Sequence, residues 1–223
     1  MPDASEPTPT PIPAPTSRPE PAEGVAATAD RAYADRLNAL QGKRWKKLLN
    51  VQLPWQLHIR RLAMGRTLDV GCGNGRNLSR LDAGSVGVDH NPYSVQTARA
   101  LGCEAYTVDE FFADPAVAKP GSFDSILAAH LVEHLQPPEA REILSSYLPM
   151  LRPGGRVVFF TPQERGYASD ATHVAFTGFD ELRQLSHDLG LDVVKHYSFP
   201  FPRFTGKAFI YNEFILIATV PQR

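Results

Sequence analysis

A glycine-rich turn placed directly after a short apolar run constrains the fold of this chain most strongly. Residues 67–70 are β-type, and glycine then recurs at every second position, as Gly71, Gly73 and Gly75. Glycine lets the backbone turn sharply and lets a ligand approach without meeting a Cβ atom. Helix-compatible residues follow the turn. A strand, a glycine turn and a helix N-terminus together predict a nucleotide-type pocket.

The segments on either side of this turn alternate between β-type and helical patterns. Expected strands lie at residues 67–70, 85–88, 105–108, 123–128, 157–161, 191–198 and 214–220. Expected helices lie at residues 77–81, 92–101, 138–151 and 179–189. This alternation is typical of an α/β, Rossmann-like domain, in which helices cover both faces of a mostly parallel sheet.

An acidic residue ends the second expected strand. Asp89 follows Asp69 by twenty residues, a position from which a carboxylate accepts hydrogen bonds from ribose hydroxyls. The glycine spacing is Gly-x-Gly-x-Gly, whereas the dinucleotide fingerprint is Gly-x-Gly-x-x-Gly. A nicotinamide oxidoreductase is therefore disfavoured.

The first 64 residues divide into two parts. Residues 1–29 carry eight prolines within the first 21 positions, a composition that predicts a disordered tail. Residues 30–64 have apolar residues at helical spacing, with Pro54 dividing two helical pieces. We interpret them as a helical lid on a Rossmann-like core at residues 65–223. Tyr33, Trp45 or Trp55 would then face a substrate.

The overall composition bounds the partners and the compartment. Net charge is −1 with a pI of about 6.7, so bulk electrostatics gives no reason to expect nucleic acid or membrane partners. The two cysteines suggest no disulfide framework and fit a reducing compartment. No apolar run approaches the roughly 20 residues of a membrane span, and no secretory signal is evident. We expect a cytoplasmic protein, and we leave open a homodimer.

Four segments resemble, in order, the motifs of class I S-adenosylmethionine-dependent methyltransferases: residues 68–75, 86–89, 123–135 and 151–158. The resemblance implies a seven-stranded sheet whose last strand, at residues 214–220, is antiparallel. It also implies that S-adenosylmethionine is the cofactor. The residues implied to surround it are Asp69, Gly71, Cys72, Gly73 and Asn77 at the turn, Asp89 and His90 at the ribose, Asp109, Glu110 and Phe111 near the adenine, and Ala129 under the methionine portion.

Candidate catalytic groups lie in the run His130-Leu-Val-Glu133-His134. A hydroxyl acceptor needs its proton removed or its pKa lowered by a base or a metal. On a helical turn, spacings of three and four bring these three polar residues to one side. The run also matches an inverted zinc-protease signature, which its position after a strand and beside the cofactor turn disfavours. The alternative is that Glu133 and His134 only organise the turn.

The resemblance extends to ubiquinone-biosynthesis O-methyltransferases and small-RNA 3′-end methyltransferases, which use Glu-x-x-Glu-His to hold a divalent ion. This chain has His130 where their first Glu stands, which leaves the ligand count open. A further candidate, His173, lies in the polar loop after the fifth expected strand. The hypothesis is that Glu133, His134 and His173 bind Mg²⁺ or Mn²⁺, with His130 or His173 as general base. A loop-packing role for His173 stays open.

The acceptor side carries an aromatic loop and a long polar loop. Residues 199–204 hold three phenylalanines and two prolines, suited either to packing or to stacking on a sugar ring. Residues 161–176 look similar to actinobacterial saccharide methyltransferases of the methylmannose polysaccharide 1-O-methyltransferase type. We therefore expect O-methylation of a saccharide or similar small molecule, with substrate contacts from Tyr33, Trp45, Tyr167 and Arg203. Open alternatives are a quinone-precursor or RNA-end O-methyltransferase and a noncatalytic binding module.

Overall fold

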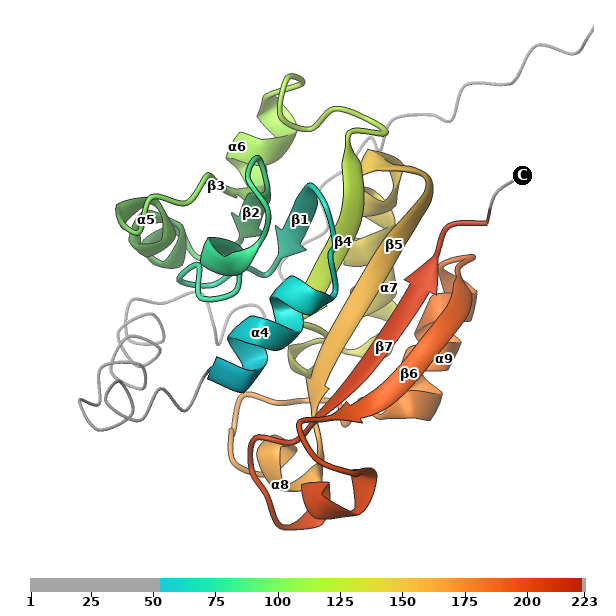
Figure 1. Ribbon diagram of the computed structural model, residues 1–223. Coiled ribbons are helices and arrows are strands. Elements are labelled where there is room, and N and C mark those ends of the chain that lie inside the picture. Colours follow the sequence, from blue (N-terminus) through green and yellow to red (C-terminus); the bar gives the residue numbers. More distant parts are fainter. Residues whose placement is uncertain (1–52, 222–223) are drawn as a thin grey trace, which may run out of the picture.

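One seven-stranded sheet organises the fold (Figure 1). A computed structural model of the chain describes residues 53–221. The strand order is β3-β2-β1-β4-β5-β7-β6. The strands are β1 (Thr67–Val70), β2 (Val86–Asp89), β3 (Ala105–Thr107), β4 (Phe123–Ala129), β5 (Leu151–Pro162), β6 (Asp192–Phe199) and β7 (Glu213–Thr219).

The sheet is parallel from β3 through β5 and antiparallel beyond. β1 pairs in parallel with β2 and with β4, and β4 pairs in parallel with β5. β7 lies between β5 and β6 and runs antiparallel to both. The predicted seven-stranded Rossmann-like sheet with an antiparallel last strand is confirmed. Because β7 is reversed, it starts at the edge where the parallel strands end.

Helices cover both faces of the sheet. In Figure 1, α4 (Leu53–Arg61) lies in front, and α7 (Pro137–Tyr147) and α9 (Phe179–Asp188) lie behind. The other helical elements are α5 (Pro92–Ala100), α6 (Val108–Ala113), α8 (Glu164–Tyr167), and the 3-10 turns η1 (Leu78–Arg80), η2 (Val132–His134), η3 (Leu148–Met150) and η4 (Arg203–Lys207). Among the described residues, no helix has the length and hydrophobicity needed to cross a membrane.

Several expected boundaries differ from the structure for identifiable reasons. The third strand stops at Thr107 because the Thr107 side chain caps α6, and Glu110 completes that capping box. The expected helix at residues 77–81 is only the turn η1. β5 begins at Leu151, six residues before the expected 157, since Leu151 already pairs with Phe123 ahead of a register shift.

The core lies on both faces of the central strands. Ile126, Leu127 and Ala128 of β4 are all fully buried, as is Phe159 of β5. Parallel strands covered on both faces read as continuous apolar runs rather than alternating ones. β6, at the edge, is exposed over its first five residues. The core therefore holds the carboxyl ends of β1, β4 and β5 rigidly.

The described part of the expected lid is a cover for the sheet. Ile59 of α4 and Met64 after it pack in one cluster with β4, β5 and β7. Pro54 is the second residue of α4, a position where a proline is tolerated, and the helical piece expected before it lies outside the described residues. Tyr33 and Trp45 lie outside the described residues.

A substitution at Gly87 tests the packing of the glycine turn against β2. A Cβ atom there would lie 2.8 Å from Cys72 Sγ and 2.9 Å from Cys72 Cβ. Gly87→Ala is expected to lower the free energy of unfolding by about 1–3 kcal/mol, because overpacking forces neighbours to shift. Urea denaturation measures this. The control Gly178→Ala, whose nearest atom is a flexible carboxylate at 3.2 Å, should lose less; equal losses would contradict the packing argument.

Candidate active site at the carboxyl edge of the sheet

The parallel strands that precede the predicted cofactor and acceptor residues end at one edge of the sheet, the lower edge in Figure 1. β1, β4 and β5 end there at Val70, Ala129 and Pro162. β7 begins there at Glu213, which is paired with Pro162. Ligands of open α/β sheets bind at the carboxyl ends of the strands. The edge is therefore the place to seek a cofactor and an acceptor.

The glycine turn is tied to the end of β2. Gly71 and Gly73 have φ values of +75° and +54°, a region that side chains disfavour. The Gly71 N–H donates to the Val88 carbonyl at 2.8 Å. The Gly73 N–H donates to Asp89 Oδ2 at 2.8 Å. The turn thus presents a fixed backbone surface beside two carboxylates.

Asp69 is a buried carboxylate with an unused oxygen. Its side chain is 1% exposed, and its Oδ2 has no hydrogen-bond partner. Burial, and then repulsion from Asp89, raise the pKa of Asp69 to about 7. A buried polar atom without a partner is uncommon and requires an explanation. A cationic or hydrogen-donating ligand at the turn would provide one.

The other cofactor positions lie around the same turn. Asp89 Oδ1 accepts the Asn91 N–H at 2.8 Å, and His90 Nδ1 lies 3.5 Å from that oxygen. Cys72 is buried, and burial raises the pKa of its thiol. Asn77 stands at the start of η1, and Ala129 ends β4. That these residues contact the cofactor stays a prediction.

Helix α6 differs from its implied role near the adenine. Phe111 is fully buried in the core, 5.8 Å from the Tyr147 ring between centroids. Its side chain has no surface to offer a cofactor, so the structure corrects that assignment. Glu110 caps α6 and accepts a hydrogen bond from Arg99 at 2.7 Å. Asp109 and Glu110 are both exposed in the first turn of α6, and a contact of either with the cofactor stays a prediction.

His130 is held between two carboxylates. Its Nδ1 lies 3.1 Å from Glu133 Oε1, and its Nε2 lies 3.0 Å from Glu213 Oε1. Burial lowers the pKa of His130, but the hydrogen bonds to Glu133 and Glu213 outweigh burial and raise it to about 9. At neutral pH the ring is therefore an imidazolium that donates to both carboxylates. A role of His130 as general base stays a prediction.

Glu133, His134 and His173 are brought together across 40 residues of sequence. One ligand atom from each lies within 4.8 Å of the others. The loop is fixed because the Val174 and Ala175 N–H groups donate to the Glu133 carbonyl at 2.9 and 3.2 Å. Ligand atoms about 2.1–2.3 Å from one ion lie roughly 3–4.5 Å apart, so small side-chain movements would let this group hold a cation.

The hydrogen bonds of the two histidines suit metal binding. His134 Nδ1 lies 3.1 Å from the Thr172 carbonyl, and His173 Nδ1 lies 2.8 Å from the Tyr167 carbonyl. A carbonyl only accepts, so each Nδ1 donates its proton there, and the Nε2 atom of each ring is the one left for a metal ion. Burial lowers the pKa of His134 and favours its neutral form. Glu133 Oε2 is buried without a hydrogen-bond partner. These donors fit a divalent cation.

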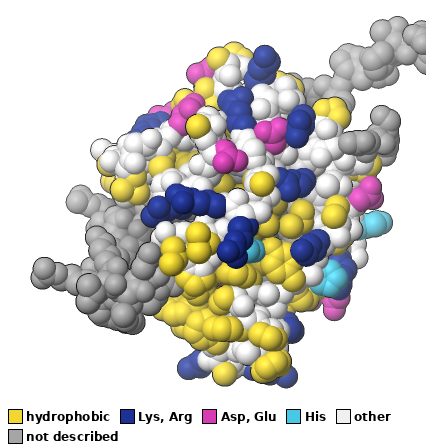
Figure 2. All heavy atoms as spheres, in the orientation of Figure 1, with side chains coloured by type: hydrophobic (Ala, Val, Ile, Leu, Met, Phe, Trp, Pro, Cys, Tyr) yellow, Lys and Arg dark blue, Asp and Glu magenta, His cyan; other side chains and the backbone are white. Residues whose placement is uncertain are grey.

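The expected acceptor contacts have partners within the protein. Tyr167 stacks on His173, with ring centroids 5.2 Å apart. Arg203 donates to both Glu164 oxygens, at 2.8 and 2.5 Å, and its guanidinium lies over the Phe214 ring. Both therefore support the loops in this structure. Phe201 and Phe204 of the aromatic loop are exposed, and Figure 2 shows hydrophobic side chains gathered over this lower part of the face.

Asn212 fixes the aromatic loop to the sheet. This fully buried residue donates to Gln163 Oε1 at 3.0 Å and to Ser198 Oγ at 2.9 Å. It also accepts the Phe201 N–H at 3.0 Å. A local sequence pattern does not reveal this residue, since its partners are distant in sequence.

Asn212→Ala should leave several of these buried groups unpaired. The expected loss is about 2–4 kcal/mol of unfolding free energy, measured by chemical denaturation. The exposed Gln184, which donates to Asp188, offers Gln184→Ala as a control, for which no comparable loss is expected. A loss in Asn212→Ala no greater than in this control would contradict the central role of the amide.

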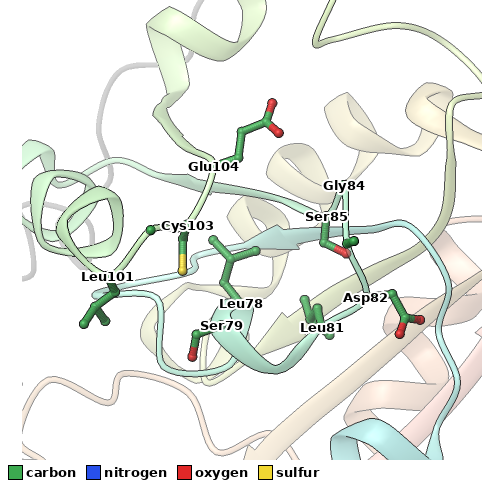
Figure 3. A pocket seen from close by; sticks show the side chains of 11 residues that line it. Leu78, Ser79, Leu81, Asp82, Gly84, Ser85, Leu101, Cys103 and Glu104 are labelled. Carbon is green, nitrogen blue, oxygen red and sulfur yellow. The ribbon is translucent and has the colours of Figure 1, made fainter.

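A hollow in the surface lies away from this edge (Figure 3). It encloses about 360 Å³ and is lined by η1, residues 81–85 and residues 101–104, which precede β2 and β3. Figure 3 shows the carboxylates of Asp82 and Glu104 extending in different directions. The two carboxylates that line this hollow therefore do not converge on one point.

Known proteins resemble the chain in sequence. It matches the methyltransferase domain family over residues 27–196. The ubiquinone biosynthesis O-methyltransferase of Xanthomonas euvesicatoria is 35% identical over 108 residues, 45% of this chain and 44% of that protein. The protein of the same name from Ralstonia nicotianae is 26% identical over 151 residues, 60% of this chain and 63% of that protein. The chain thus spans about half the length of the curated relatives it matches.

Solved structures resemble the fold. A magnesium protoporphyrin IX methyltransferase from Synechocystis PCC 6803, with bound SAH, aligns with a TM-score of 0.61 at 16% identity, covering 88% of this chain and 98% of that one. A SAM-dependent methyltransferase from Archaeoglobus fulgidus aligns with a TM-score of 0.60 at 18% identity, covering 78% and 96%. The expectation of a methyltransferase is confirmed at the level of the family. The chain belongs to the methyltransferase domain family and has the Rossmann-like fold of S-adenosylmethionine-dependent methyltransferases.

Proposed function

We propose that the protein is an S-adenosylmethionine-dependent O-methyltransferase that acts on a hydroxyl of a saccharide or similar small molecule, assisted by a divalent cation. The observation that carries the proposal is the group formed by Glu133, His134 and His173. It lies at the same edge as the glycine turn. A methyl donor and an activated hydroxyl must meet in line, so this shared edge supports transfer between them.

The residues at the turn fit the cofactor. The unpaired Asp69 oxygen suits a cationic group, and Asp89 stands where a carboxylate can accept from ribose hydroxyls. The glycines at positions 71 and 73 let the ligand approach the backbone. S-adenosylmethionine supplies an electrophilic methyl group. The protein binds and orients it, and the buried carboxylates keep the surroundings negative near a sulfonium.

The three-residue group fits Mg²⁺ or Mn²⁺. Glu133 would supply a carboxylate oxygen, and His134 and His173 their Nε2 atoms. A divalent cation held there would supply Lewis acidity that lowers the pKa of a nearby hydroxyl, so that its proton could pass to solvent as the methyl group is transferred. The protein's own part is to fix both tautomers through the Thr172 and Tyr167 carbonyls. His130 contributes an imidazolium that holds Glu133.

Exposed aromatic rings support a saccharide acceptor. Phe201, Phe204 and Tyr211 are exposed around the aromatic loop. Flat apolar faces of this kind stack on the C–H face of a sugar ring, while the polar loop can meet its hydroxyls. A quinone precursor with a phenolic hydroxyl is the second candidate. It is favoured by the relatives named ubiquinone biosynthesis O-methyltransferases.

The test is a transfer assay with S-adenosylmethionine carrying a labelled methyl group. The acceptors are short saccharides, methylated and unmethylated, a catechol-type quinone precursor and an RNA with a free 3′ end, each with Mg²⁺, Mn²⁺ or EDTA. Transfer to a saccharide that EDTA suppresses is expected. Transfer only to the catechol would establish the second candidate, and transfer only to RNA would exclude both.

Two further results would contradict the proposal. Transfer undiminished by EDTA would remove the metal from it. Failure of the protein to bind S-adenosylmethionine in calorimetry would indicate a noncatalytic module instead. Size measurement of the same sample would test the homodimer, which stays a prediction.

A further inference from the structure

Glu213 is a buried carboxylate at the site that the sequence patterns did not single out. It is 6% exposed and opens β7. Its backbone is paired with Pro162 of β5 on one side and with Phe199 of β6 on the other. Its carbonyl also accepts a hydrogen bond from Gln163 at 2.9 Å. The carboxylate is therefore mounted on a rigid part of the sheet.

The Glu213 side chain is joined to Glu133 through one ring. Glu213 Oε1 lies 3.0 Å from His130 Nε2, and His130 Nδ1 lies 3.1 Å from Glu133 Oε1. The His130 backbone is also fixed, since its N–H donates to the Phe160 carbonyl at 2.9 Å. The ring is thus held at both nitrogens and at its backbone.

The His130 backbone has an uncommon conformation. Its φ is +57°, which a non-glycine residue adopts only when its surroundings hold it there. This conformation turns the chain from the end of β4 into η2, so that the ring reaches both carboxylates. Such strain at the end of a strand is typical of functional positions.

We propose that Glu213 is a positioning residue that acts through His130 to orient Glu133 toward His134 and His173. The proposal deepens the function proposed above and rests on it. A carboxylate whose one oxygen is held by a fixed ring has little freedom to rotate, so its second oxygen is directed before a cation arrives. Groups that orient a metal ligand in this way commonly change metal affinity 10- to 100-fold.

The first test measures the Mn²⁺ affinity of the full chain by calorimetric titration. Glu213→Leu is expected to weaken Mn²⁺ binding about 10- to 100-fold, and the isosteric Glu213→Gln to weaken it less, because the amide still bonds the ring. S-adenosylmethionine affinity should stay unchanged. The exposed Glu142 of α7 supplies the control Glu142→Gln, with unchanged Mn²⁺ affinity. Wild-type affinity in both Glu213 variants would overturn the proposal.

A double-mutant cycle separates an indirect role from a direct one. If Glu213 acts through His130, Glu213→Gln should weaken Mn²⁺ binding little further in a His130→Asn background. If the fold loss of Mn²⁺ affinity in the double variant equals the product of the losses in the two single variants, Glu213 acts directly, and the proposal is overturned. This arm uses the isosteric variant, so it stays informative if Glu213→Leu does not fold.

A metal-independent measurement distinguishes failure of this proposal from failure of the proposed function. If the wild-type protein binds no Mn²⁺, the metal-assisted function is wrong. The ¹⁵N resonances of the His130 ring then report on Glu213 directly. Glu213→Gln is expected to change the Nε2 resonance of His130. Unchanged ¹⁵N resonances of the His130 ring would overturn the positioning role of Glu213.

Discussion

Replacing Glu133 with glutamine is expected to lower kcat/KM at least about 100-fold and to weaken Mn²⁺ binding by a similar or larger factor. The substitution keeps the size of the side chain and removes the negative charge from the Glu133, His134 and His173 group. It also converts the partner of His130 from a carboxylate to an amide. The effect should exceed that of Glu213→Gln, because Glu133 belongs to the group itself.

Steady-state kinetics over a range of Mn²⁺ concentrations, with calorimetry, measure this effect. His173→Ala is expected to behave alike, since it removes an Nε2 donor. The exposed histidine of α9 supplies the matched control His187→Ala, which should keep activity and metal binding. If Glu133→Gln retained wild-type kcat/KM and Mn²⁺ affinity, the three-residue group would have no role in the reaction. An unchanged S-adenosylmethionine affinity in these variants would localise the defect to the acceptor side.

Asp69→Asn is expected to change how stability depends on pH. The folded-state pKa of Asp69 is raised to about 7 from the ordinary value of 3.8, so the folded protein holds this proton more tightly than the unfolded chain. The stabilisation is therefore complete below about pH 4 and is lost as pH rises through about 7. The size of the shift corresponds to about 4 kcal/mol between about pH 4 and about pH 8.

Urea denaturation of the cofactor-free protein at several pH values measures this change. The stability of Asp69→Asn relative to wild type should rise by several kcal/mol from about pH 4 to about pH 8, because the amide does not ionise. Asp180→Asn, an exposed substitution on α9, should show no comparable trend. The same Asp69 variant should bind S-adenosylmethionine more weakly, since it loses a negative charge at the turn. Parallel stability curves for wild type and Asp69→Asn would refute the raised pKa.

The structure agrees most closely with the sequence-based expectation at the glycine turn. Its spacing and the position of Asp89 are local features, and short-range backbone chemistry sets both the turn and the strand that precedes it. The agreement is poorer at α6. The implied adenine contact at Phe111 is wrong because the Phe111 side chain of α6 is buried against Tyr147 of α7. This packing joins residues that are far apart in sequence.

At the acceptor edge, too, some residues are grouped by the sequence and others only by the fold. Glu133 and His134 are adjacent in sequence, and His173 follows the next strand, so the rule that parallel strands end at one edge was enough to group them. Glu213 lies 83 residues from His130 and joins it only through the reversed course of β7. His58 reaches Tyr197 over 139 residues, at 2.7 Å, through the packing of α4 on the sheet.

The sequence by itself determined the α/β class, the mostly parallel sheet, the glycine turn and the grouping of Glu133, His134 and His173. These follow from periodicity and from short spacings, which act within a few residues. Only the tertiary structure decided that His130 lies between the Glu133 and Glu213 carboxylates and that Phe111 belongs to the core. The physical reason is that burial and long-range strand pairing fix the partners of a side chain, and neither is encoded in its local pattern.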